Sequence, residues 1–166
     1  MDVLTAIRTK YAVRQFTGDP VPDDVLETIL RAALRAQSSK NSQPWQLIVV
    51  RKRDTLATLS MLGDFLGHVA GAAACVVFAA PDERGWTYFD LGQCAAYLQL
   101  AAHDLGVGSC LGAIYRPDEA KRLLGVPAGM RLDALVSLGY PAESHRPAKL
   151  GGRKPLSAAV HWERLS

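Results

Sequence analysis

The sequence has few cysteines, no long apolar run and little net charge, and each absence excludes a class of protein. Its 166 residues include three cysteines, Cys75, Cys94 and Cys110, an odd count without CxxC spacing. We therefore expect reduced, mostly buried thiols in a cytoplasmic protein. The longest strongly apolar run, Val69 to Ala80, is too short to cross a bilayer. The N-terminus has no basic segment followed by an apolar one, so we expect no signal peptide and no membrane partner.

Motifs of several common catalytic classes are also missing. The formal net charge is +3, which is too small to indicate nucleic-acid binding but suits a protein that holds one or two phosphates. There is no G-x-S-x-G or P-loop motif, and the four histidines lack H-x-x-x-H spacing, so we expect no metal site. Gly106-Val107-Gly108 follows a helical pattern, so we interpret it as a helix end rather than a dinucleotide-binding motif. A cysteine nucleophile stays open, because its partners would meet in space rather than in sequence.

The hydrophobic pattern predicts one α+β domain over residues 1–166 with a single central sheet. Asp2 is expected to cap a helix to about Lys10 whose inner face carries Leu4 and Ile7. The tail, residues 142–166, has little helical period and a strand-like end, Val160 to Leu165, so we expect it to pack outside its own domain. The other predicted helices are Pro22 to Ala33, Asp54 to Leu62, Asp90 to Leu105 and Pro117 to Leu124, and the extended segments are Gln46–Val50, Ala74–Ala80, Ser109–Gly112 and Leu132–Leu138.

A polar loop is the most informative feature of the sequence. Ser38-Ser39-Lys40-Asn41-Ser42-Gln43-Pro44-Trp45 precedes the strand at Gln46–Val50. Such a run of small polar and amide side chains cannot build a core. It can build a rigid loop, and ligand-binding residues concentrate in loops on a rigid scaffold.

Two further groups of residues each allow two interpretations. The basic residues Lys10, Arg14, Arg153 and Lys154 are either solvated charges or a phosphate clamp, for which the arginine fork is suited. The aromatic cluster Trp86, Tyr88 and Phe89, after the turn at Pro81 to Gly85, is either a satellite of the core or the wall of a pocket for a flat ligand. Lys40 joins this cluster as a candidate substrate-pocket residue.

Four segments together resemble the FMN-dependent nitroreductase family. Ile7 to Phe16 (Ile-Arg-Thr-Lys-Tyr-Ala-Val-Arg-Gln-Phe) resembles that family's opening motif, and the loop from Ser38 to Trp45 resembles its serine-asparagine-glutamine-proline-tryptophan loop. Ser109-Cys110-Leu111-Gly112 resembles its later flavin-contact segment. Leu138-Gly139-Tyr140-Pro141 with Arg153-Lys154-Pro155-Leu156 resembles its closing pattern. The segments occur in the family's order over nearly the whole chain.

The resemblance implies an α+β sandwich with a mixed or antiparallel sheet flanked by helices, and an intertwined homodimer with two FMN sites at its interface. It also implies NADH or NADPH as electron donor and nitroaromatics or quinones as acceptors, reduced by a ping-pong mechanism in which the flavin carries the chemistry. By position, the ribityl phosphate would lie along Lys10, Tyr11, Ala12 and Arg14, with Arg153 and Lys154 completing its site. Ser38, Ser39 and Asn41 would contact the flavin of the other subunit, and Leu111 and Gly112 would offer backbone groups near the ring.

The sequence departs from the family pattern at three of these positions. Lys10 stands where the family has arginine, Ala12 where it has serine, and Gln37 where it has proline. Three other functions stay open: another flavin reaction on the same fold, such as dehalogenation or flavin fragmentation; a flavin-binding protein without turnover; and an interaction module without a cofactor. NADH consumption and the absorption spectrum of the protein would separate these classes.

Overall fold

A computed structural model describes residues 1–81, 85–146 and 152–165 of the chain. The turn expected at Pro81 to Gly85 and part of the tail therefore fall outside the described residues, at 82–84 and at 147–151 and 166. The helices and strands follow the order α1 (Val3–Thr9), α2 (Asp23–Ala33), η1 (Ser39–Asn41), β1 (Gln46–Val50), α3 (Arg53–Ser60), η2 (Gly67–Val69), β2 (Ala74–Pro81), α4 (Thr87–Asp104), β3 (Gly108–Ala113), α5 (Pro117–Leu124), β4 (Met130–Gly139) and η3 (Leu156–Ala158).

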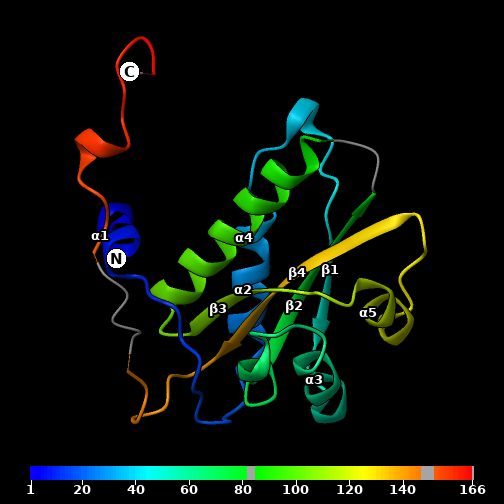
Figure 1. The fold of residues 1–166 in the computed structure, drawn as a ribbon. Coiled ribbons are helices and arrows are strands. Elements are labelled where there is room, and N and C mark those ends of the chain that lie inside the picture. The colour runs from blue at the N-terminus through cyan, green and yellow to red at the C-terminus, as the bar shows by residue number, and fades with distance from the viewer. Residues whose placement is uncertain (82–84, 147–151, 166) are drawn as a thin grey trace.

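The four strands of the described residues form one antiparallel sheet between two layers of helices (Figure 1). Their order is β1-β2-β4-β3, so β3 is an edge strand. Val76 and Phe78 of β2 pack with α2 and α4, whereas Cys75 and Val77 pack in a second cluster with α3 and α5. Because both faces of β2 are covered, this strand is a continuous apolar run rather than an alternating one. The α+β class and the single sheet expected from the sequence are confirmed.

The N-terminal and C-terminal segments differ from the expectations. Leu4 and Ile7 of α1 are 70% and 59% exposed, and the buried residue of this helix is Ala6. The inner face predicted for α1 was therefore wrong in the single chain, because periodicity identifies an apolar face but not what covers it. The strand-like end predicted for the tail was also wrong: residues 152–165 form a short 3-10 turn and bends, with their side chains exposed. In Figure 1 this tail extends away from the sheet.

Candidate functional site

The segment that follows α1 lies against the start of β3. The N–H of Val13 donates to the carbonyl oxygen of Ser109 at 2.9 Å, within a parallel bridge between Ala12 and Ser109. The approach is close because residue 108 is glycine: a Cβ there would meet the Val13 side chain at 2.7 Å. This contact carries Lys10 and Arg14 to the strand that holds Leu111 and Gly112. The structure thus brings together two of the segments that the sequence resemblance assigned to the cofactor.

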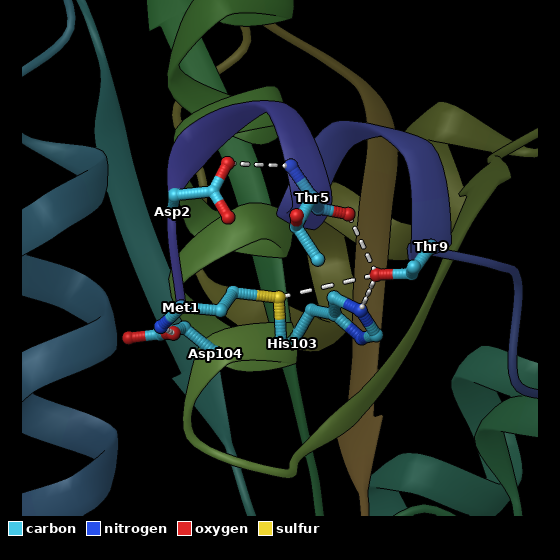
Figure 2. Close-up of polar contacts among 6 residues, drawn as sticks. All are labelled: Met1, Asp2, Thr5, Thr9, His103 and Asp104. Carbon is cyan, nitrogen blue, oxygen red and sulfur yellow. Dashed lines mark hydrogen bonds and ion pairs between the residues drawn. The ribbon is translucent and has the colours of Figure 1, made fainter.

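Helix α1 is fixed against the last turn of α4, and this sets the position of Lys10. Figure 2 shows the contacts: Asp2 caps the helix by accepting the N–H of Thr5 at 3.0 Å, and Thr9 Oγ1 lies 2.9 Å from His103 Nε2. The amino group of Met1 pairs with Asp104. The predicted cap at Asp2 is confirmed, and the basic segment begins directly after this anchored helix.

The two cations of this segment have no acidic partner in the part of the chain that the structure describes. None of the ion pairs found there uses Lys10 or Arg14. Burial is the main cause that lowers the pKa of Lys10, and the charge of Arg14 lowers it further. Burial raises the pKa of Cys110, while Arg14 and Lys10 act in the opposite direction. Two cations without an acidic partner can bind an anion such as a phosphate. Lys10 and Arg14 therefore fit the FMN phosphate that the sequence resemblance implies.

A small cavity of about 150 Å³ lies next to this segment. It is bounded by the N-terminal segment, the end of α4 and the start of β3, and its lining consists of Lys10, Tyr11, Val13, His103, Gly106, Val107, Gly108, Ser109 and Pro141. The ring of Tyr11 stacks on His145, with centroids 5.8 Å apart, and meets the edge of His103 at 6.4 Å. Gly106 has a left-handed φ of 73° at the end of α4, which confirms that Gly106-Val107-Gly108 ends a helix.

A histidine that the sequence analysis missed lies close to Gly112 of β3, since a Cβ on that glycine would be 3.5 Å from His68 Nε2. His68 Nδ1 is 2.9 Å from the hydroxyl of Ser137, which in turn donates to the carbonyl of Cys110 at 3.4 Å. Because the hydroxyl has one proton, Nδ1 of His68 is the donor in the first contact. Burial, followed by the charge of Arg14, lowers the pKa of His68 to about 4. His68 is therefore neutral near pH 7, and no local sequence signal pairs it with Ser137.

The polar loop lies at the far end of α4 from the basic segment. Both oxygens of Asp90, in the first turn of α4, accept the N–H of Ser39 at 3.2 Å. His103, which contacts Thr9 and Tyr11, is in the last turn of the same helix. At a rise of about 1.5 Å per residue, these two turns are about 20 Å apart along the helix. The structure therefore does not bring Ser38, Ser39 and Asn41 next to Lys10 and Arg14 within one chain.

A second cavity joins part of the aromatic cluster to β3. It has a volume of about 360 Å³ and is lined by Phe78, Tyr88, Leu91, Gly92, Ala95, Ala96, Gln99, Leu111, Asp133 and Ala134. The guanidinium of Arg131 lies 3.5 Å from the centre of the Tyr88 ring. Trp86 and Phe89 pack on each other with centroids 5.2 Å apart, but both are exposed and neither lines this cavity. Of the three aromatic residues, the structure brings only Tyr88 to Leu111.

The remaining candidate residues lie on the surface. Lys40 is exposed in the polar loop, and Arg153 and Lys154 are exposed on the tail. Cys75, Cys94 and Cys110 are buried free thiols, as expected. Among residues 1–81, 85–146 and 152–165, no group of three histidine, cysteine or acidic side chains could hold a metal ion. Within the same residues, no helix has the length and apolar character needed to span a bilayer.

The α+β sandwich, with two cations beside the edge of its sheet that have no described acidic partner, is suited to a protein that binds an anionic cofactor. Comparison with known proteins identifies the family. The sequence model of the nitroreductase family matches residues 7–64 and 58–140, and the chain belongs to this family.

Individual relatives cover nearly the whole chain. A protein named NADH dehydrogenase from Thermus thermophilus is 30% identical over 98% of this chain and 96% of its own length. A protein from Archaeoglobus fulgidus named putative NADH dehydrogenase/NAD(P)H nitroreductase is 33% identical over 86% of this chain and 87% of its own length. The structure of an FMN-dependent nitroreductase from Clostridium difficile matches with a TM-score of 0.88 and 26% identity over 98% of this chain and all of that one.

Proposed function

We propose that this protein is an FMN-dependent oxidoreductase that takes electrons from NADH or NADPH and reduces small acceptors of the nitroaromatic or quinone type. The observation that carries the proposal is the position of Lys10 and Arg14, two cations without a described acidic partner, beside the strand that holds Leu111 and Gly112. The relatives named as NAD(P)H nitroreductase and FMN-dependent nitroreductase support the choice of cofactor and donor.

The N-terminal segment would hold the phosphate of the cofactor. Arg14 would offer a planar fork of N–H donors to this phosphate, and Lys10 would offer a point charge. Tyr11 and Ala12 would line the site with their backbone and side chains. Arg153 and Lys154, exposed on the tail, would complete this site. Among the described residues, β3 is an edge strand whose open side is bridged to Ala12 at Ser109. Beyond this bridge, backbone groups of Leu111 and Gly112 would be available to the flavin ring.

FMN, when bound, supplies the electron-transfer chemistry, and the chain supplies binding, orientation and electrostatics. The cavity that joins Tyr88 to Leu111 would admit a flat donor or acceptor to the ring. Lys40, Trp86 and Phe89 would add to the entrance of this pocket. With one pocket for both, donor and acceptor would bind in turn, which is the basis of a ping-pong mechanism.

The site would need two copies of the chain. Ser38, Ser39 and Asn41 lie about 20 Å along α4 from the contacts of Thr9 and Tyr11, so they would serve the cofactor of a second subunit. The exposed apolar side chains of Leu4 and Ile7 offer a surface for such a subunit. Residues 142–166 would pack on that subunit as a C-terminal extension of the single domain.

The experiment is an absorption spectrum of the purified protein, followed by FMN titration and steady-state kinetics. We expect flavin bands near about 370 and 450 nm, and parallel lines when NADH or NADPH is varied against a quinone. Intersecting lines with a ternary complex would refute the shared pocket. A yellow protein that consumes no NADH or NADPH with any acceptor would instead be a flavin-binding module. A colourless protein that takes up no FMN would refute the proposed function.

A further inference from the structure

The carboxylate of Asp90 is buried and accepts a hydrogen bond from a backbone N–H 51 residues away. Asp90 is 5% exposed, and each of its carboxylate oxygens lies 3.2 Å from the backbone nitrogen of Ser39. A buried carboxylate is costly unless it is hydrogen-bonded, so its position in the first turn of α4 has a structural consequence. Only a carboxylate can present two acceptor oxygens to one N–H, because an asparagine would place an NH₂ donor on one side.

The loop that Asp90 anchors holds an unfavourable backbone conformation. Lys40, Asn41 and Gln43 have φ values of 54°, 53° and 45°, although none of them is glycine. Left-handed conformations cost free energy for residues that carry a Cβ, and they persist only when the surroundings enforce them. Such conformations concentrate at ligand sites, where they preform a binding surface.

Most of the hydrogen bonds described for this loop lie within it. The N–H groups of Asn41 and Ser42 donate to the carbonyl oxygens of Ser38 and Ser39, each at 3.0 Å. The hydroxyl of Ser38 accepts the N–H of Gln43 at 2.9 Å, and the side-chain amide of Gln43 donates to Asn41 at 3.3 Å. At its C-terminal end, Trp45 is buried in the core cluster with α2 and α4. At its N-terminal end, the contact from Ser39 to Asp90 fastens it to α4. Without the hydrogen bond from Ser39 to Asp90, the loop would be anchored only at Trp45, and its internal hydrogen bonds alone would have to keep three residues left-handed.

We propose that Asp90 is a positioning residue of the cofactor site. Through Ser39 it holds the segment from Ser38 to Gln43 in place, with the left-handed residues Lys40, Asn41 and Gln43 in it, and so preforms the segment for a flavin. A preformed loop loses less conformational entropy on binding, so removal of the anchor weakens affinity although Asp90 itself touches no ligand. The inference rests on the proposed FMN function, since the loop would otherwise have no flavin to contact.

The test combines FMN titration with hydrogen exchange of the peptide covering residues 37–45 in the FMN-free protein. In Asp90→Asn, we expect exchange of this peptide to accelerate at least tenfold and the FMN dissociation constant to rise at least tenfold. The matched control is Asp24→Asn, which changes an exposed carboxylate in the first turn of α2 and should leave both quantities unchanged.

A second variant keeps the test valid if Asp90→Asn unfolds. Ser39→Pro removes the N–H donor, and Ser38 already has the extended backbone (φ −140°, ψ 155°) that precedes proline. It should reproduce both effects, whereas Ser39→Ala, which loses only the hydroxyl, should not accelerate exchange. If hydrogen exchange of residues 37–45 and FMN affinity in Asp90→Asn and Ser39→Pro are the same as in the parent, the inference is wrong while the proposed function stands. If the parent itself takes up no FMN, the proposed function falls and the inference falls with it.

Discussion

The N–H of Val13 donates to the carbonyl oxygen of Ser109 at 2.9 Å, and this bond joins the N-terminal segment to the edge strand of the sheet. The segments meet only because Gly108 has no side chain where Val13 packs. Lys10 and Arg14 flank this bond in sequence, and Leu111 and Gly112 follow it along β3. The close approach of two backbones therefore sets the geometry of the candidate cofactor site.

We expect Gly108→Ala to lower stability and weaken FMN binding together. Its Cβ would meet Val13 Cγ2 at 2.7 Å and Val13 Cβ at 2.8 Å, so the segment must shift. Overpacking of this kind costs typically about 1–3 kcal/mol. Denaturant unfolding should show the loss, and FMN titration should show weaker binding. Gly71→Ala is the control, because its Cβ would meet nothing within 4 Å and the residue is exposed. Equal stability of the two variants would contradict the role of this contact.

Stability should fall as the pH is lowered from about 6.5 to 4, in part through His68. Burial and the charge of Arg14 lower the pKa of this residue from 6.5 to about 4, so the unfolded chain binds a proton in this range that the folded chain does not. Stability therefore rises with pH here, and the contribution of His68 is present above pH 6.5 and lost as the pH falls to 4. At about 1.4 kcal/mol per pKa unit, the free energy of unfolding lost through His68 is at most about 3.5 kcal/mol.

His68→Asn separates this effect from other titrations. The asparagine amide can still donate to Ser137, but it does not titrate. Urea unfolding of the parent and the variant at pH 7 and pH 4.5 should give a smaller pH dependence for the variant. The same pH dependence in both proteins would mean that His68 is not the titrating group. The comparison should be made without FMN, since a bound phosphate beside Arg14 would change the charge near His68.

Much of the fold could be predicted from the sequence because its strongest elements are locally encoded. The apolar run of β2, the stripe of α2 and the proline at the start of α5 each predict one element, and the structure confirms all three. The start of α4 was less well predicted: the helix begins at Thr87, three residues before Asp90. Aromatic residues at positions 88 and 89 have no strong helix preference, so the local sequence did not indicate the first turn.

The missed features depend on contacts between distant residues. The bonds from Asp90 to Ser39 and from His68 to Ser137 span 51 and 69 residues, and no local period connects their partners. Val160 and Trp162 suggested a strand by their β propensity, but a strand needs a second strand to pair with, and residues 152–165 join none of the strands that the structure describes. The candidate cofactor residues were found through motif resemblance, whereas the anchors that hold them were found only in the structure.

We expect the protein to sediment as a homodimer at micromolar concentration. Leu4 and Ile7 expose large apolar side chains on one helix, and water contact with such a surface is unfavourable unless a partner covers it. The double variant Leu4→Glu/Ile7→Glu should shift the protein toward monomer and weaken FMN binding, because the polar loop would no longer reach a second subunit. Leu123→Glu, on α5 across the sheet, is the control. A folded monomer in the parent would contradict both the dimer and the shared site.

Arg14 should be the main anchor of the cofactor phosphate. It is exposed, so an incoming anion can reach it, and it has no described ion pair to break. Lys10 is half-buried, and its pKa is lowered, chiefly because burial disfavours its charged form. Ala12 contributes no hydroxyl, which leaves fewer contacts to share the phosphate. Loss of a charge-assisted hydrogen bond costs about 1.5–3 kcal/mol, which corresponds to roughly ten- to a hundredfold in affinity.

Arg14→Ala should therefore purify pale, regain colour with excess FMN and remain dimeric, and Arg153→Ala should show a milder loss because Lys154 can substitute for it. The measurement is fluorescence titration of FMN into each variant, with sedimentation to check the dimer. Arg8→Ala is a matched control, since Arg8 is an exposed arginine on α1 that bonds Thr5 within its own helix. If only the overall charge of the protein mattered, Arg8→Ala and Arg14→Ala would weaken FMN binding equally, because each removes one positive charge. A loss confined to Arg14→Ala would instead locate the phosphate beside β3, and an unchanged dissociation constant would return Arg14 to the role of a solvated surface charge.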